Sequence, residues 1–235
     1  MANLLAIDTS TDACSVALLC AGQISEYHEV IPRQHSQRLF GMLAELLPSG
    51  RLREQGIDAI SYGEGPGSFT GLRVCASAVQ GLCFANQLPA VPVSTLHAQA
   101  YTALREGRVS SGDTLLSTLD AQIGELYWSL LWVEGEHIVA IQPAAVCKPQ
   151  NLAVGGDSEL VALGSGLAHL DAMPEGVRAR LGARHPDLLP RARDQFPLAL
   201  AAFARGETQA ADAVCPVYVR DEISWKKLSE QGKSA

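Results

Sequence analysis

The chain has 235 residues, of which 47% are apolar and 18% charged, a balance typical of globular proteins and unlike that of disordered chains. This length suits one or two domains with a sizeable buried core. The formal net charge is −7 and no apolar run approaches the ~20 residues of a membrane span, which excludes membrane proteins and disfavours a protein that binds nucleic acid alone.

The N-terminus shows no secretion signal, because Asp8 interrupts the first apolar stretch before an h-region can form. Six cysteines are present, but none lies in a CxxC pair, so redox motifs and thiolate zinc sites have no support. We therefore expect a cytoplasmic protein whose cysteines are reduced.

Three short strands open the chain. Residues 4–7 form an apolar run that ends at Asp8, residues 14–20 form a second run, and residues 24–30 alternate enough for a third. The loop at residues 9–12 is rich in hydroxyl and carboxylate groups. The sequence therefore predicts a meander whose first loop is polar.

A helix is expected at residues 36–47, where Ser36 can cap its start and Pro48 follows its end. Its apolar positions cover more of the circumference than one core-facing stripe needs. Two explanations stay open: the helix is enclosed within one domain, or part of its apolar surface meets another chain. The apolar positions are Leu39, Phe40, Met42, Leu43, Leu46 and Leu47.

A strand at residues 57–62 leads into a glycine-rich loop at 63–71 and a helix at 72–85. This layout is typical of phosphate-binding loops, because helix N-termini present free N–H groups. The loop has neither the GKS or GKT of a Walker motif nor the GxGxxG spacing. A nucleotide site and a structural turn therefore both stay open.

The opening pattern returns in the second half of the chain. Asp120 ends a strand as Asp8 does, a turn and a second strand follow, and a third strand completes the meander. We interpret this as an ancient duplication that gives two similar lobes facing across a cleft, with chance similarity as the alternative. The expected strands of the second meander are 115–119, 125–132 and 137–141.

The remaining elements are predicted from shorter patterns. The polar stretch at 105–112 indicates a domain boundary, and residues 174–197, rich in proline and arginine, predict irregular connections with short helices. The other expected elements are strands at 89–93 and 161–163, helices at 94–104 and 198–204, an extended segment at 216–220 and a frayed tail from 225.

Catalytic and metal motifs have little support. No two of the six histidines lie at the HxxxH spacing that places both on one helical face. Ser68 lies in the glycine-rich loop, but nothing near it in the sequence would activate it. Asp8 and Asp120 could hold magnesium across a cleft, although that needs phosphates and donors that the sequence alone does not supply.

Three stretches resemble the TsaB (YeaZ) family, the dimerisation subunits of the bacterial tRNA threonylcarbamoyladenosine machinery. They are residues 6–18, residues 62–74 with the specific run GPGSFTGLR, and residues 120–127, supported by 216–220. The resemblance covers residues 1 to about 222. Two departures are Gln122, where arginine is common, and the additional Glu64.

The resemblance implies an α/β ASKHA fold, as in actin, Hsp70 and sugar kinases, with two related lobes that each hold a mixed sheet flanked by helices. It also implies a non-catalytic role. The chain would pair with a TsaD-like catalytic paralogue and a TsaE-like ATPase. The complex would transfer threonylcarbamoyl to the anticodon-adjacent adenosine of tRNAs that read codons starting with A. Contact with tRNA would be indirect, and the chain alone would form a homodimer.

The resemblance further implies that metal and ATP belong to the partners, with no cofactor held tightly by this chain. The paralogue carries a metal-binding HxxxH, whereas here Thr95 and Gln99 stand at the ligand positions and His97 is out of register. No metal site is therefore expected in this chain.

The family's pairing surface is built from its first two helices, so the resemblance implies a four-helix seam. Candidate interface residues are Leu39, Leu43, Leu46, Leu72, Val79 and Leu82. Residues expected in vestigial nucleotide or phosphate loops are Asp8, Thr9, Ser10, Thr11, Gly65, Gly67, Ser68, Thr70 and Asp120.

The expected domains are an N-terminal lobe at 1–104, joined by the C-terminal segment 196–222, a smaller second lobe at 105–195, and a flexible tail at 223–235. An alternative function is an ATP-dependent phosphotransferase or ATPase of the same fold, suggested by Asp8 and Asp120. A metal-dependent peptidase is a third hypothesis, which the missing ligands disfavour.

Overall fold

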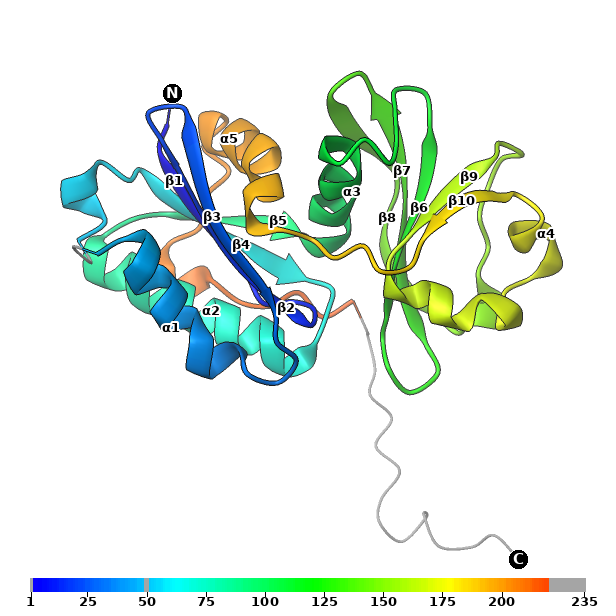
Figure 1. Cartoon of the computed structure of the whole chain (residues 1–235), viewed down its shortest axis with the longest axis horizontal. Helices are drawn as coiled ribbons and strands as arrows, with labels where there is room; N and C mark the ends of the chain where they lie inside the picture. Colours follow the sequence, from blue (N-terminus) through cyan, green and yellow to red (C-terminus); the bar gives the residue numbers. More distant parts are fainter. Residues whose placement is uncertain (1, 49–50, 220–235) are drawn as a thin grey trace, which may run out of the picture.

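The computed structural model describes residues 2–48 and 51–219, which form two lobes side by side, each built on a five-stranded mixed sheet (Figure 1). In the first sheet, in the order β3-β2-β1-β4-β5, β1 pairs antiparallel with β2 and parallel with β4. Its strands are β1 (Leu4–Asp8), β2 (Ala13–Cys20), β3 (Gln23–Val30), β4 (Ala59–Gly65) and β5 (Ala90–Ser94).

The second sheet repeats this topology in the order β8-β7-β6-β9-β10, with β6 antiparallel to β7 and parallel to β9. Asp8 and Asp120 end β1 and β6, the corresponding central strands, as the sequence predicts. The expectation of two related lobes with mixed sheets is therefore confirmed. The strands are β6 (Thr114–Asp120), β7 (Leu126–Glu134), β8 (His137–Cys147), β9 (Leu160–Leu163) and β10 (Leu181–His185).

One strand differs from the prediction. The irregular connections expected at 174–197 contain the short helix α4 (Glu175–Arg178), but also β10 (Leu181–His185), which pairs in parallel with β9. Three consecutive exposed residues at 182–184 give β10 neither an apolar run nor a clean alternation. Its sequence, Leu-Gly-Ala-Arg-His, therefore gives little strand signal, and its pairing with β9 is interrupted by a register shift.

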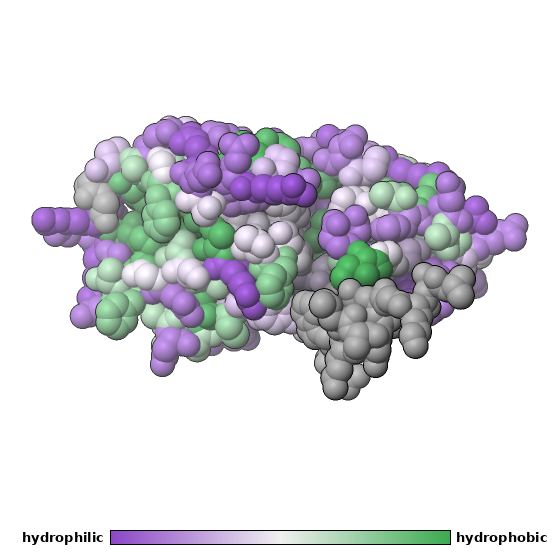
Figure 2. All heavy atoms as spheres, turned by 90° about the horizontal axis from the view of Figure 1, so that it is seen from below, coloured by the Kyte–Doolittle hydropathy of each residue, from purple (hydrophilic) through white to green (hydrophobic). Residues whose placement is uncertain are grey.

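Helices cover both faces of the first sheet. On one face lie α1 (His35–Leu46) and α2 (Phe69–Asn86), and on the other lies α5 (Phe196–Ala204). β1 reads as an unbroken apolar run because alternate side chains enter the two different cores. Seen from below, the half of the molecule that holds α1 and α2 shows apolar surface among polar side chains (Figure 2).

Helix α3 (Thr95–Arg105) lies between the lobes and contacts strands of both sheets. Opposite it, the chain returns from the second lobe through a buried turn at Ala192–Gln195. Asp194 accepts hydrogen bonds from Thr102 Oγ1 at 2.8 Å and from Arg105 Nε at 2.7 Å, and its side chain is only 6% exposed. A partly buried, hydrogen-bonded ion pair thus joins α3 to the turn through which the chain returns from the second lobe.

Next to this ion pair, β3 supplies Glu26 and His28. Glu26 faces Arg191 at 3.4 Å and Arg193 at 3.9 Å, and burial raises the pKa of its carboxyl group. Burial, with a smaller contribution from Arg191, lowers the pKa of His28 to about 4. His28 is therefore neutral in the folded chain at neutral pH.

His28→Gln is expected to reduce the loss of stability in mild acid. The unfolded chain binds a proton at His28 near pH 6.5, whereas the folded chain does so only near pH 4. Wild-type stability therefore falls as pH decreases through this window, by about 1–2 kcal/mol once partial exposure is considered. Urea unfolding at pH 7, 5.5 and 4.5 measures the difference; equal pH slopes for both proteins would contradict it.

The C-terminal part of the described chain returns to the first lobe. Gln209 forms a bridge with Ala90 of β5, and Val217 N donates to Glu64 O at 2.8 Å. The predicted extended segment is described up to residue 219, and the expected tail at 223–235 lies outside the described residues. Within residues 2–48 and 51–219, no helix is long and apolar enough to cross a membrane.

Candidate functional site

A cleft of about 1460 Å³ opens between the lobes. The first lobe lines it with the loop after β1 and the N-terminal ends of α1 and α2, and the second lobe with the loop after β6. Among the predicted loop residues, those that line the cleft are Ser10, Thr11, Gly67, Ser68, Thr70 and Asp120.

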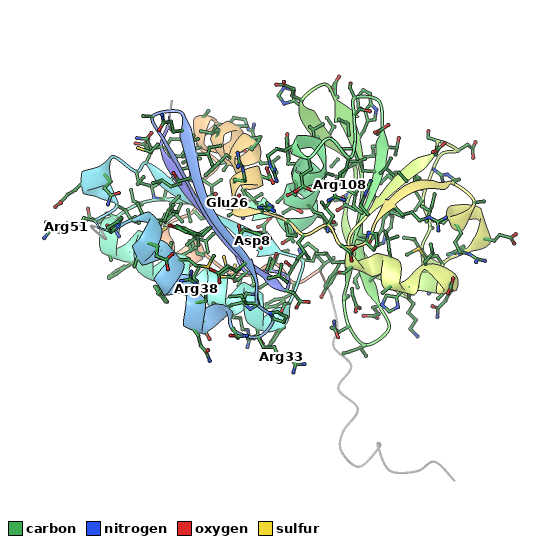
Figure 3. The ribbon with its side chains drawn as sticks, viewed as in Figure 1. Asp8, Glu26, Arg33, Arg38, Arg51 and Arg108 are labelled. Carbon is green, nitrogen blue, oxygen red and sulfur yellow. The ribbon has the colours of Figure 1, made fainter. Side chains whose placement is uncertain are left out.

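Asp8, labelled in Figure 3, is buried at the end of β1 in the first lobe. Its Oδ1 accepts hydrogen bonds from Ser10 N at 2.9 Å and Ser10 Oγ at 2.6 Å, and its Oδ2 from Gln195 Nε2 at 3.2 Å. Burial raises the pKa of Asp8, while the bonds from Ser10 and Gln195 oppose that rise. The side chain is 1% exposed and does not line the cleft, so it offers no oxygen to a ligand there.

Asp120, by contrast, lines the cleft and is partly exposed. Its carboxylate accepts from Gln122 N at 2.9 Å and lies 3.1 Å from His169 Nε2. The two aspartates that end corresponding strands therefore face different surroundings. The structure does not bring them together at one site.

The glycine-rich loop packs against the loop after β1. Ser68 N donates to Ser10 O at 2.7 Å, and Thr9 Oγ1 donates to Gly71 O at 2.7 Å. A Cβ at Gly67 or Gly71 would collide with the carbonyl oxygens of Ser10 and Thr9. These glycines make room for the chain's own backbone, which favours the structural turn over the phosphate-binding loop.

The close approach at Gly71 predicts a stability effect with a matched control. Gly71→Ala is expected to cost about 2–3 kcal/mol, because the new Cβ overlaps the Thr9 carbonyl and the loop must shift. Gly81→Ala lies in the same helix with nothing within 4 Å, and should stabilise by roughly 0.5–1 kcal/mol. Thermal unfolding measures both, and equal effects would refute the packing argument.

Thr95 and Gln99, which the resemblance sets at metal-ligand positions, are completely buried in the first half of α3. Gln99 Nε2 donates to Leu188 O at 2.8 Å, and Gln99 Oε1 accepts from Ser117 Oγ at 2.7 Å. Gln99 is therefore engaged by its own chain, whereas the buried Thr95 Oγ1 has no hydrogen-bond partner. Within the described part of the chain, no group of three or more His, Cys, Asp or Glu could hold a metal ion.

Four of the six residues expected at the pairing surface on α1 and α2 are buried inside the first lobe. Leu39, Leu43, Leu72 and Val79 lie in the core of the first lobe, each 7% exposed or less. They pack towards the sheet and offer almost no surface to another chain. Leu46 and Leu82 are only partly buried.

Three phenylalanines of the same helices are exposed instead: Phe40 by 59%, Phe69 by 52% and Phe84 by 82%. Phe84 follows the buried Val79 by five residues, which places it about 140° away around the helix. Because Val79 faces the sheet, a residue about 140° away from it around α2 faces away from the sheet, so helical spacing alone could have placed Phe84 on the surface.

Between the N-terminal halves of α1 and α2 lies a shallow groove of about 490 Å³, called here the α1–α2 groove. It is lined by Ser36, Phe40, Phe69, Thr70, Arg73, Val74, Ser77 and Ala78. At its cleft end, Tyr218 stacks on Phe69 with ring centroids 5.7 Å apart and accepts a hydrogen bond from Arg73 Nε at 3.1 Å. The Arg73 guanidinium lies 3.8 Å from the Phe69 ring centroid.

Two lobes of one topology around a central cleft define an ASKHA-like fold. The model of the tRNA N6-adenosine threonylcarbamoyltransferase family (TsaD) matches residues 23–173. The tRNA threonylcarbamoyladenosine biosynthesis protein TsaB of Escherichia coli K12 is 37% identical, over 96% of this chain and 98% of its own length. TsaB of Haemophilus influenzae is 34% identical, over 96% and 97%.

Among solved structures, YeaZ from Pseudomonas aeruginosa superposes with a TM-score of 0.84 and 40% identity, covering 93% of this chain and all of that one. The chain therefore belongs to the TsaB (YeaZ) family, within the wider family that the TsaD model describes.

Proposed function

We propose that the chain is a non-catalytic scaffold subunit that pairs through α1 and α2 with a TsaD-like catalytic paralogue. Its family acts in tRNA threonylcarbamoyladenosine biosynthesis. The observation that carries the proposal is that α1 and α2 expose large phenylalanine side chains, since exposed apolar surface of this kind marks interaction sites. Leu46 and Leu82 would lie at the margin of this surface.

The loops beside the cleft support a scaffold role over an enzymatic one, because their polar groups and glycines serve contacts within the chain. Asp8 is enclosed by Ser10 and Gln195, and the glycines of the loop accommodate backbone. We propose that the loops around the cleft are vestigial nucleotide loops, and that ATP and metal belong to the partners.

The wider assembly follows from the same proposal. A TsaE-like ATPase would join the pair, and tRNA would be bound mainly by the partners, because this chain has a net charge of −7. The complex would modify the anticodon-adjacent adenosine of tRNAs that read codons starting with A. Without its partner, the chain would pair with itself through the same face, in the cytoplasm.

Reconstitution tests this function directly. A tagged chain co-expressed with the TsaD-like protein of the same cell should be recovered with it in equal amounts. Threonylcarbamoyl transfer to tRNA should need both proteins and the ATPase. Full transfer without this chain, or no association, would refute the scaffold role.

One observation favours the alternative of an ATP-dependent enzyme: the cleft is large, and Ser10, Thr11, Ser68 and Thr70 are among the residues that line it. Calorimetry with ATP and magnesium on the chain alone separates the two functions. Micromolar binding together with turnover would favour the enzyme, and no binding would favour the scaffold.

A further inference from the structure

Helix α2 carries one charged side chain, Arg73, and this side chain is exposed. On α1 the charges of Arg38 are offset within the chain, because its Nη1 lies 2.8 Å from Glu45 Oε1 and its Nη2 lies 2.6 Å from Glu29 Oε1. Among residues 2–48 and 51–219, Arg73 forms no ion pair. Its charge is therefore the one on these two helices that its own chain leaves without a carboxylate.

Arg73 lies on the same side of α2 as the most exposed phenylalanine, Phe84. Phe84 follows Arg73 by eleven residues, which at about 3.6 residues per turn leaves the two side chains only about 20° apart around the helix. Ser77 and Gln80 lie between them on this stripe, and both are exposed. A partner helix that runs along α2 and covers Phe84 therefore also reaches Arg73.

The guanidinium of Arg73 is held in place by two aromatic residues. Its Nε donates a hydrogen bond to Tyr218 Oη at 3.1 Å, and its central carbon lies 3.8 Å from the centroid of the Phe69 ring. Within the described part of the chain, Nη1 and Nη2 form no hydrogen bond. A fixed guanidinium with both of these nitrogens available suits a carboxylate, which accepts two parallel N–H bonds.

The α1–α2 groove places apolar surface beside this cation. Phe40 and Val74 line the groove together with Arg73, so an apolar side chain that enters the groove lies next to the guanidinium. A guanidinium covered in an interface without a carboxylate would oppose binding, because its hydration is lost and nothing replaces it. Arginine is also among the residues that most often dominate the binding energy of an interface.

We propose that Arg73 determines which partner this face accepts: the TsaD-like protein presents an aspartate or glutamate to Arg73 Nη1 and Nη2, next to an apolar side chain that enters the α1–α2 groove. This inference rests on the proposed function, since it requires pairing through α1 and α2, and it adds the chemistry that the partner must bring. A partner with lysine or arginine at that place would be rejected, because two like charges would be covered together.

Binding of purified Arg73 variants to the TsaD-like protein, measured by surface plasmon resonance, tests the pairing. Arg73→Gln is expected to raise Kd roughly tenfold and Arg73→Glu roughly 100-fold, mainly through faster dissociation. Arg33→Gln is the matched control, because Arg33 is also exposed and lines the cleft but not the groove; it should change Kd less than twofold. Equal effects of Arg33→Gln and Arg73→Gln, or none from Arg73→Glu, would overturn the proposal.

A structural role of Arg73 predicts a different result for Tyr218→Phe. This variant removes the hydrogen bond from Arg73 Nε but keeps the charge, so it should raise Kd less than threefold. A loss as large as that of Arg73→Gln would show that Arg73 acts by holding Tyr218, and would overturn the proposal.

A charge swap identifies the carboxylate. In the Arg73→Glu background, the aspartates and glutamates on the partner's paired helices are changed to lysine one at a time. One of these changes should restore affinity at least tenfold, and restoration by none of them would refute the pairing.

Phe84→Asp, measured beside these variants, separates this inference from the proposed function. If Phe84→Asp weakens pairing while Arg73→Gln and Arg73→Glu do not, pairing through α1 and α2 stands and the role of Arg73 is wrong. If all three leave Kd unchanged, the seam itself lies elsewhere and both proposals fail. Circular dichroism confirms that each variant is folded.

Discussion

Phe84→Asp is expected to weaken pairing with the TsaD-like partner at least 30-fold without unfolding the chain. Phe84 is 82% exposed on α2, so the free protein loses little when its ring is removed. In a helical seam the ring would be buried, and the aspartate would bring an unpaired charge into an apolar contact. Aromatic residues of this kind commonly contribute about 2–4 kcal/mol to binding, or roughly 30- to 1000-fold in Kd.

The control for this variant lies on the other lobe. Ile141 is 55% exposed on β8, so Ile141→Asp makes the same chemical change far from α1 and α2 and should leave affinity within twofold. Surface plasmon resonance on the purified pair measures both variants. Equal affinities for Phe84→Asp and wild type would place the seam elsewhere.

Charged substitutions at Val79 and at the buried leucines that the sequence suggests would not test the seam. Val79 is 0% exposed between α2 and the sheet, so Val79→Asp buries a charge in the core and unfolds the first lobe. A loss of pairing in that variant would therefore report on folding. The exposed Phe84 avoids this ambiguity.

The sequence predicts the architecture well because the two lobes repeat one pattern. The run from Leu4 to Asp8 and the run from Thr114 to Asp120 each form a central strand with an antiparallel neighbour that follows directly in the chain. Such local hairpin signals are readable from alternation and turns. β10 has no such signal, because it is formed by a non-local parallel pairing with β9.

The site is less predictable for a physical reason. An apolar stripe on α1 or α2 shows that a helix is buried somewhere, but not which apolar residues a neighbouring sheet already covers. Leu39 and Phe40 are adjacent in the sequence, yet one is 0% and the other 59% exposed. Similarly, the polar loop after β1 looks like a ligand site until Gln195, 187 residues away, is found to bind Asp8.

Asp194→Ala is expected to lower the free energy of unfolding by about 3–5 kcal/mol. Asp194 Oδ1 accepts from Arg105 Nε at 2.7 Å, and Oδ2 accepts from Arg105 Nη2 at 2.9 Å and Thr102 Oγ1 at 2.8 Å. Removing the carboxylate leaves the partly buried Arg105 guanidinium without its main acceptor, which costs more than the pair itself contributes. Thr102 Oγ1 keeps only the weaker bond to Ala98 O at 3.1 Å. The melting temperature should fall by roughly 10 °C.

Asp187→Ala is the matched control, because Asp187 is exposed on the same return segment and its loss should change stability by less than about 0.5 kcal/mol. Since Asp194 joins the turn at Ala192–Gln195 to α3, its removal should also loosen the lobe junction. Hydrogen exchange should therefore increase first in α3 and in residues 188–195, before the strands of either sheet. Uniform exchange across both lobes would show that Asp194 stabilises the whole fold without holding the two lobes together.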